Sequence, residues 1–196
     1  QTLILSALDT RITVSIPVAG HSPVWQRTAC LEDMGDLEQV PSDLCAAADY
    51  DVLTALLAPR PTLLIYNRND DCCFQTRRTR KSIYEPVRPY FDLLGASANL
   101  EFYDNVDPGT HNYDADNRSQ LYRFLNRHFQ LRTPETDLPW QAELRTEADL
   151  NVGLPRKNAT LISLASQAAQ KSAPARRMRR TARSTKQARQ RLESLL

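Results

Sequence analysis

The sequence has 196 residues, of which 41% are hydrophobic and 24% charged, a composition typical of a globular protein with a substantial core. Its apolar runs all fall short of the roughly 20 residues of a membrane span, so we expect no membrane partner. The formal net charge of +2 hides an asymmetry. Residues 1–150 hold 14 Lys and Arg against 22 Asp and Glu, whereas residues 151–196 hold 11 against 1. This split predicts an acidic folded body followed by a basic arm.

The first 60 residues contain three segments with the patterns of regular structure. Residues 1–9 are apolar on most sides, as in a buried helix. Residues 11–18 are rich in β-branched and apolar side chains, which favours a strand covered on both faces in a parallel sheet. A longer excursion follows over residues 24–58, in which residues 49–57 are predicted to be helical before a proline-rich turn ends the helix.

Strand and helix patterns then alternate along the chain. Residues 61–66 and 100–103 are predicted to be buried strands, and residues 77–94 a helix that two prolines kink or delay. Residues 114–129 carry an apolar stripe at helical spacing, typical of a helix lying on a sheet. The alternation predicts an α/β fold, with a parallel sheet of about three strands and flanking helices.

The pattern changes at about residue 131, where prolines and polar residues replace the apolar periodicity. We therefore predict one α/β domain over residues 1–131, and a linker with a basic tail, helical or disordered, over residues 132–196. Within that tail, residues 159–169 have the pattern of a weak amphipathic helix. The basic cluster at residues 176–180 lacks interleaved aromatic side chains, so a nucleic acid is not the expected partner.

Two polar residues with catalytic potential follow the two central strands. The strand at residues 61–66 runs into a turn that contains Asp70, and the strand at residues 100–103 is followed by His111. Loops after adjacent parallel strands meet at one edge of the sheet, where ligands bind. A carboxylate followed by a histidine is the order of the last two members of a Ser…Asp…His triad in α/β-hydrolases. The 196 residues contain no Gly-x-Ser-x-Gly turn to provide the first member.

Each of these assignments has an alternative. Asp71 competes with Asp70 as the acid, and either carboxylate fits an ordinary solvated turn. An exposed loop histidine is the alternative for His111. His21 follows the first predicted strand at the same sheet edge and is a candidate substrate contact, whereas His128 lies on the apolar stripe of a helix and is expected to be packed.

The cysteines give no metal-binding signature. Cys30, Cys45, Cys72 and Cys73 lack a Cys-x-x-Cys spacing, and we predict neither a metal nor a cofactor. The adjacent Cys72 and Cys73 come directly after the candidate acid, where a metal or redox role competes with ordinary packing.

Three segments resemble one known family. They are QTLILSALD at residues 1–9, LLIYNRNDDCCF at residues 63–74 and DPGTHNY at residues 107–113. Together they resemble the acetyl xylan esterase-like branch of the α/β-hydrolases, over residues 1 to about 131. The resemblance implies a serine esterase that acts on a small ester or an acetylated carbohydrate without a cofactor, with Asp70 as the triad acid and His111 as the base.

The same resemblance implies that part of the catalytic machinery lies elsewhere. In that family the segment resembling residues 1–9 directly follows the Gly-x-Ser-Gly-Gly nucleophile elbow, so the serine and both oxyanion-hole amides have no counterpart in this sequence. We expect the C-terminal half of a hydrolase domain, partnered by the upstream half of the same domain and inactive alone. The alternative is a non-catalytic interaction protein, a truncated hydrolase body that displays a basic arm. A Gly-x-Ser-x-Gly motif encoded directly before residue 1 would favour the enzyme.

Overall fold

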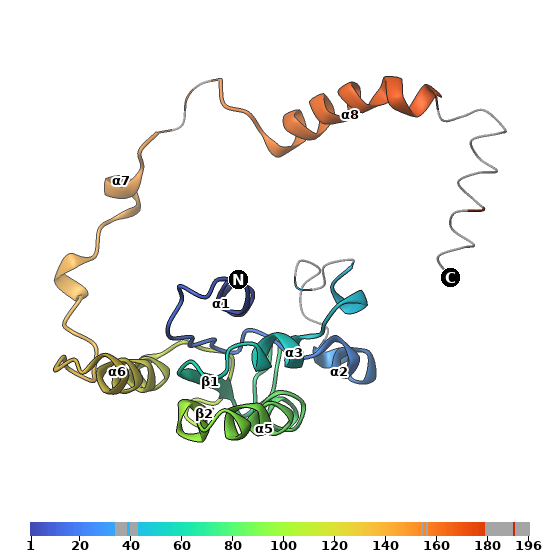
Figure 1. The fold of residues 1–196 in the computed structure, drawn as a ribbon. Coiled ribbons are helices and arrows are strands. Elements are labelled where there is room, and N and C mark those ends of the chain that lie inside the picture. The colour runs from blue at the N-terminus through green and yellow to red at the C-terminus, as the bar shows by residue number, and fades with distance from the viewer. Residues whose placement is uncertain (34–38, 40–42, 154, 156, 179–189, 191–196) are drawn as a thin grey trace. The chain divides into compact units, whose positions relative to one another are not determined.

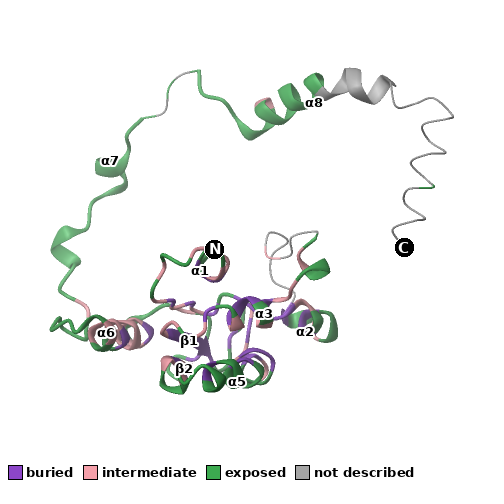
Figure 2. Cartoon of the chain, viewed as in Figure 1, coloured by how far each residue is buried: buried purple, intermediate pink, exposed green. Residues whose placement is uncertain are grey.

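The computed structural model describes residues 1–33, 39, 43–153, 155, 157–178 and 190. The chain divides into two compact units, Gln1–Ala142 and Glu143–Leu196. The buried side chains of the described residues lie in the first unit, as the colouring in Figure 2 shows. Among the helices of the described part, none has the length and apolar character needed to cross a membrane.

The first unit is built on a parallel pair of strands, β1 (Thr62–Asn67) and β2 (Leu100–Asn105) (Figure 1). In their register, Thr62 lies opposite Leu100 and Asn67 opposite Asn105. Every residue of β1 is buried, because helices cover both faces of the strand and a further stretch of chain approaches the edge of β1 that does not face β2. Both strands extend beyond their predicted ends and bring an asparagine to the same edge of the sheet.

The predicted third strand is not continuous, so the described sheet has two strands rather than three. Residues 11–18 pair with β1 at two isolated parallel bridges, which involve Ser15 and Val18. The backbone N–H groups of Ser15 and Ala19 donate to the carbonyls of Pro61 and Ile65 at 3.0 and 2.8 Å. Midway between these two donors is Pro17, which has no N–H to give. Proline therefore removes the hydrogen bond that would have joined the two bridges into one strand.

The larger core lies on the face of the sheet covered by α1 (Thr2–Leu8), α3 (Tyr50–Ala55) and α5 (Glu85–Leu93). Side chains alternate between the two faces of a strand, and Leu64 and Tyr66 of β1 point into this core. Their buried partners from the helices include Leu3, Leu53, Val87 and Phe91.

A single long helix, α6 (Ala115–Phe129), packs on the opposite face. Leu63 and Ile65 of β1 meet Phe124 of α6 there, and all three side chains are buried. The sheet thus lies between two layers of helices. This mixed α/β arrangement is compatible with part of an α/β-hydrolase fold.

The opening helix is less buried than its apolar sequence predicts. In α1, Leu3 and Ser6 are buried, but Leu5 and Leu8 are 59% and 72% exposed. Only one side of α1 therefore contributes to the core of this chain.

The predicted helix at residues 77–94 is divided into three parts. It begins with α4 (Thr76–Thr79), widens into a π-helical turn at Arg80–Tyr84 and continues as α5. Pro86 lies at the start of α5 and cannot donate a hydrogen bond to the carbonyl four residues earlier. A widened turn is a common way for a helix to accommodate such a missing bond.

Short segments complete the first unit. They are α2 (Val24–Ala29) and the 3-10 turns η1 (Leu31–Asp33), η3 (Leu44–Ala46) and η5 (Ser97–Asn99). A further 3-10 turn, η6 (Gln141–Glu143), spans the boundary between the two units.

The second unit contains α7 (Glu147–Leu150) and α8 (Leu161–Met178). Thr146 caps α7 in a reciprocal capping box with Asp149. The helix predicted at residues 159–169 corresponds to the first part of α8. The predicted basic cluster at residues 176–180 reaches residues 179 and 180, which lie outside the described residues.

The packing of α5 predicts very different costs for two truncations on the same helix. Phe91 is fully buried and Leu93 is 83% exposed. Phe91→Ala should lower the free energy of unfolding by about 3–5 kcal/mol, because it removes buried apolar surface and leaves a cavity. Leu93→Ala should change it by no more than about 0.5 kcal/mol. Urea unfolding followed by circular dichroism measures both free energies, and similar losses for the two variants would contradict this packing of α5.

Candidate functional site

Two loops meet at the edge of the sheet where β1 and β2 end. The backbone N–H of Arg68 donates to the carbonyl of Asn105 at 2.8 Å, and that of Asn69 to the carbonyl of Gly109 at 2.9 Å. Gly109 has a φ of +72°, and a Cβ added there would lie 3.0 Å from the carbonyl oxygen of Val106. Glycine is therefore required for the second loop to turn back toward the first.

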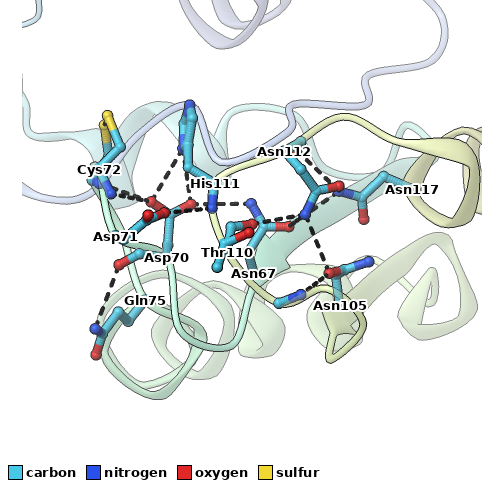
Figure 3. A network of polar contacts seen from close by, with 12 residues as sticks. Asn67, Asp70, Asp71, Cys72, Gln75, Asn105, Thr110, His111, Asn112 and Asn117 are labelled. Carbon is cyan, nitrogen blue, oxygen red and sulfur yellow. Dashed lines mark hydrogen bonds and ion pairs between the residues drawn. The ribbon is translucent and has the colours of Figure 1, made fainter.

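These loops bring the predicted acid and base together (Figure 3). Nδ1 of His111 lies 3.0 and 3.1 Å from the two carboxylate oxygens of Asp70. The side chain of Asp70 is fully buried, whereas that of His111 is 45% exposed. Because an ionised carboxylate only accepts hydrogen bonds, the ring hydrogen belongs on Nδ1. The lone pair of Nε2 then faces away from Asp70.

Several donors hold the Asp70 carboxylate in place. Nδ2 of Asn67 donates to Oδ2 at 3.0 Å, while the backbone N–H groups of Cys73 and Cys72 donate to Oδ1 at 2.8 and 3.1 Å. Burial alone raises the pKa of Asp70, but these hydrogen bonds and the one from His111 outweigh it and hold that pKa below its ordinary value. Asp70 is consequently a carboxylate at neutral pH, and its orientation is fixed from three sides.

A cluster of asparagine side chains supports the pair of Asp70 and His111 through Asn67. Oδ1 of Asn67 accepts from Nδ2 of Asn117 at 3.1 Å and from Nδ2 of Asn112 at 3.4 Å. Oδ1 of Asn105 accepts the backbone N–H of Gly109 at 2.9 Å. Asn117 belongs to α6, so the cluster ties the helix on one face of the sheet to both loops at its edge (Figure 3).

The competing acid, Asp71, has a different contact. Its Oδ1 accepts the backbone N–H of His111 at 2.8 Å. The described hydrogen bonds of Asp71 thus reach the main chain of His111, whereas Asp70 bonds to the ring. Asp71 fixes the position of the His111 backbone, and Asp70 fixes the orientation of its ring.

His21 has no described hydrogen bond to this pair. It is 1% exposed, and it lines a hollow of about 780 Å³ whose lining includes neither Asp70 nor His111. Burial, with a further contribution from the charge of Arg27, lowers the pKa of His21 to about 3, so its ring is neutral at physiological pH. Nε2 of His21 lies 3.2 Å from the Thr54 hydroxyl, whose own hydrogen goes to a backbone carbonyl of α3. Nε2 is therefore the donor, and Nδ1 is a buried acceptor with no partner among the described residues.

The residues that hold Asp70 in place are not among those that the sequence pattern predicts. Asn67 directly follows the predicted strand at residues 61–66, and an amide at the end of a buried strand, three residues before a carboxylate, is a local signal for such a contact. The role of the Cys72 and Cys73 backbones carries no signal in residue type, because any residue other than proline offers the same N–H. Cys72 is exposed, so the packing interpretation does not apply to its side chain.

The lowered pKa of Asp70 links the site to stability at acid pH. Its carboxyl binds a proton less readily when folded than when unfolded, so its stabilising contribution is complete above the unfolded pKa of about 4 and is lost as the pH falls through the folded pKa. Asp70→Asn removes this contribution at every pH. The difference in unfolding free energy between the original chain and Asp70→Asn should therefore shrink as the pH falls from about 5 to about 2. Urea unfolding at a series of pH values measures it, and a constant difference would contradict the assignment.

Comparison with known proteins gives a likeness in fold. No protein-family model and no curated protein matches the sequence. A solved structure named Methylesterase BT1017 is similar, with a TM-score of 0.52 and 20% identity over 69% of this chain and 29% of that one. The glucuronoyl esterase catalytic domain from Hypocrea jecorina is also similar, with a TM-score of 0.50 and 16% identity over 68% of this chain and 42% of that one. The chain therefore spans less than half the length of either structure. At these identities the likeness shows the fold: about two thirds of the chain folds like part of two solved esterases.

Proposed function

We propose that Asp70 and His111 are the acid and base of a serine carboxylic ester hydrolase, which acts on an acetylated carbohydrate or a similar small ester. The observation that carries the proposal is a buried carboxylate on Nδ1 of an accessible histidine, at the carboxyl edge of parallel strands. The fold shared with two solved structures named as esterases supports the class of reaction. In this proposal the serine comes from a part of the hydrolase domain that these 196 residues do not contain.

In this proposal His111 moves the protons of acyl transfer. A serine hydroxyl is a weak nucleophile until a base removes its proton. Nε2 of His111 accepts that proton as the serine oxygen attacks the ester carbonyl, and then gives it to the departing alcohol. Water then attacks the acyl-enzyme while Nε2 accepts its proton. Nε2 returns that proton to the serine oxygen as the carboxylic acid product is released.

Asp70 acts through the histidine. It accepts the Nδ1 hydrogen, which keeps the Nε2 lone pair available, and it stabilises the imidazolium that forms when Nε2 takes a proton. Its lowered pKa keeps the carboxylate ionised through the cycle. The hydrogen bonds from Asn67 and the two cysteine amides prevent its rotation away from the ring.

The nucleophile is outside this arrangement. Among the described residues, the hydrogen bonds of His111 go to Asp70 and Asp71, and none goes to a serine hydroxyl. The solved esterases extend well beyond the part that this chain covers. A longer polypeptide that carries the serine and the oxyanion-hole amides accounts for both observations.

The 196-residue chain should therefore have no esterase activity of its own. Without a serine and oxyanion donors, water is the remaining nucleophile, and the developing oxyanion has no stabilising hydrogen bonds. Purified chain and its His111→Ala variant should hydrolyse 4-nitrophenyl acetate at the same background rate. Faster hydrolysis by the original chain that is lost in His111→Ala would contradict the proposal.

In the longer polypeptide the two neighbouring aspartates should differ sharply. Asp70→Asn presents an amide to Nδ1 and favours the wrong tautomer of His111, so kcat should fall by roughly 10⁴-fold. Asp71→Asn retains a carbonyl oxygen that can accept the backbone N–H of His111, and should cost less than about tenfold. Steady-state kinetics on an acetylated substrate, with circular dichroism to check the fold, make the comparison. A larger loss in Asp71→Asn would show that the acid has been misassigned.

A further inference from the structure

The turn that holds Asp70 also brings two sulfur atoms beside His111. One ligand atom each from Cys72, Cys73 and His111 lies within 4.8 Å of the others. The two sulfurs are 2.8 Å apart, and both residues are thiols. Cys72 is exposed and Cys73 half-buried, so the cluster is open to solvent. We propose that Cys72, Cys73 and His111 bind a thiophilic divalent cation of the Zn²⁺ type, a site that the cysteine spacing did not predict.

The ligand set suits such an ion. Zn²⁺ takes four tetrahedral ligands, with sulfur at about 2.3 Å and imidazole nitrogen at about 2.0 Å. Ligand atoms at these bond lengths are separated by roughly 3.5–3.8 Å, well inside the span of the cluster. The two sulfurs must move apart by about 1 Å to reach that separation. Rotation of the exposed Cys72 side chain can provide the movement without disturbing the core.

The surroundings of His111 match those of a metal ligand. A metal-bound histidine commonly donates its second ring N–H to a carboxylate, which orients the ring. Asp70 already occupies Nδ1 of His111, so Nε2 is the nitrogen left for the ion. In Figure 3 the sulfur of Cys72 and the ring of His111 extend to the same side of Asp70.

The turn also prepares the two cysteines. Their backbone N–H groups donate to the Asp70 carboxylate at 3.1 and 2.8 Å, so the positions that carry the sulfurs are fixed before an ion arrives. Binding releases the two thiol protons to solvent, and the two thiolates balance the charge of the divalent ion. Water fills the fourth position, as in sites that keep one position open.

This site and the proposed esterase reaction exclude each other, a consequence that rests on the proposed function. Both need the Nε2 lone pair of His111. An ion held by Cys72 and Cys73 would keep the base from accepting the serine proton, so the metal would inhibit.

Titration of the reduced chain with Co²⁺ tests the metal site without any measurement of activity. Co²⁺ accepts the ligands of Zn²⁺ and reports thiolates through a sulfur-to-cobalt charge-transfer band and tetrahedral geometry through intense visible bands. We expect one Co²⁺ per chain, both spectral features, displacement by Zn²⁺ and release of two protons. Gel filtration should show the same elution volume with and without the ion, because the three ligands belong to one chain.

Four variants assign the ligands. Cys72→Ser combined with Cys73→Ser should abolish the charge-transfer band. Cys30→Ser combined with Cys45→Ser is the matched control and should leave the spectrum unchanged. His111→Ala should lose the tetrahedral bands or weaken binding at least tenfold, and Asp70→Asn should weaken it by about 10–100-fold.

Three results would overturn the proposal. They are a weak octahedral spectrum in the original chain, an unchanged spectrum in the Cys72 and Cys73 double variant, and one ion shared between two chains. Circular dichroism of each variant separates a lost ligand from a lost fold, and the single Cys72→Ser variant, at an exposed position, repeats the test if the double variant unfolds. Failure of the esterase proposal would leave all these spectra unaffected.

Discussion

A buried carboxylate is the constraint around which this structure is organised. Asp70 has no exposed side-chain surface, and an ionised carboxylate removed from water is costly unless its oxygens receive hydrogen bonds. The donors come from the end of β1, from the turn after it and from the loop after β2. Asn117 of α6 donates in turn to Asn67, which holds the carboxylate, so the position of α6 is tied to that of Asp70. Placing one carboxylate therefore fixes the relation of two strands, two loops and a helix.

The pairing of acid and histidine was predictable because it follows from topology. Parallel strands end at one edge of a sheet, so polar residues that follow β1 and β2 must meet there. The apolar stripe at residues 114–129 predicted α6 with bounds that differ by one residue from those of the structure. Interactions inside a single turn have no such periodic signature, which is why only the structure shows the roles of Asn67 and of the Cys72 and Cys73 amides.

The remaining differences from prediction have local causes. The apolar and β-branched pattern of residues 11–18 is that of a strand, but the pattern does not register that Pro17 lacks the one N–H that continuity requires. The opening helix shows a different difficulty. Apolar composition predicts that a surface will be covered, and it does not say by which chain, so Leu5 and Leu8 of α1 are exposed in this structure.

The anchors of Asp70 also determine which conditions can disturb it. Apart from the imidazole of His111, the described partners of the Asp70 carboxylate are a neutral side-chain amide and backbone N–H groups. Added salt screens charges at the surface, such as the pair formed by Arg68 with Asp104, and has little effect on hydrogen bonds between buried dipoles. The orientation of Asp70 should therefore depend little on ionic strength. The ion pair between Arg68 and Asp104, which fastens the same loop at the surface, should weaken as salt is added.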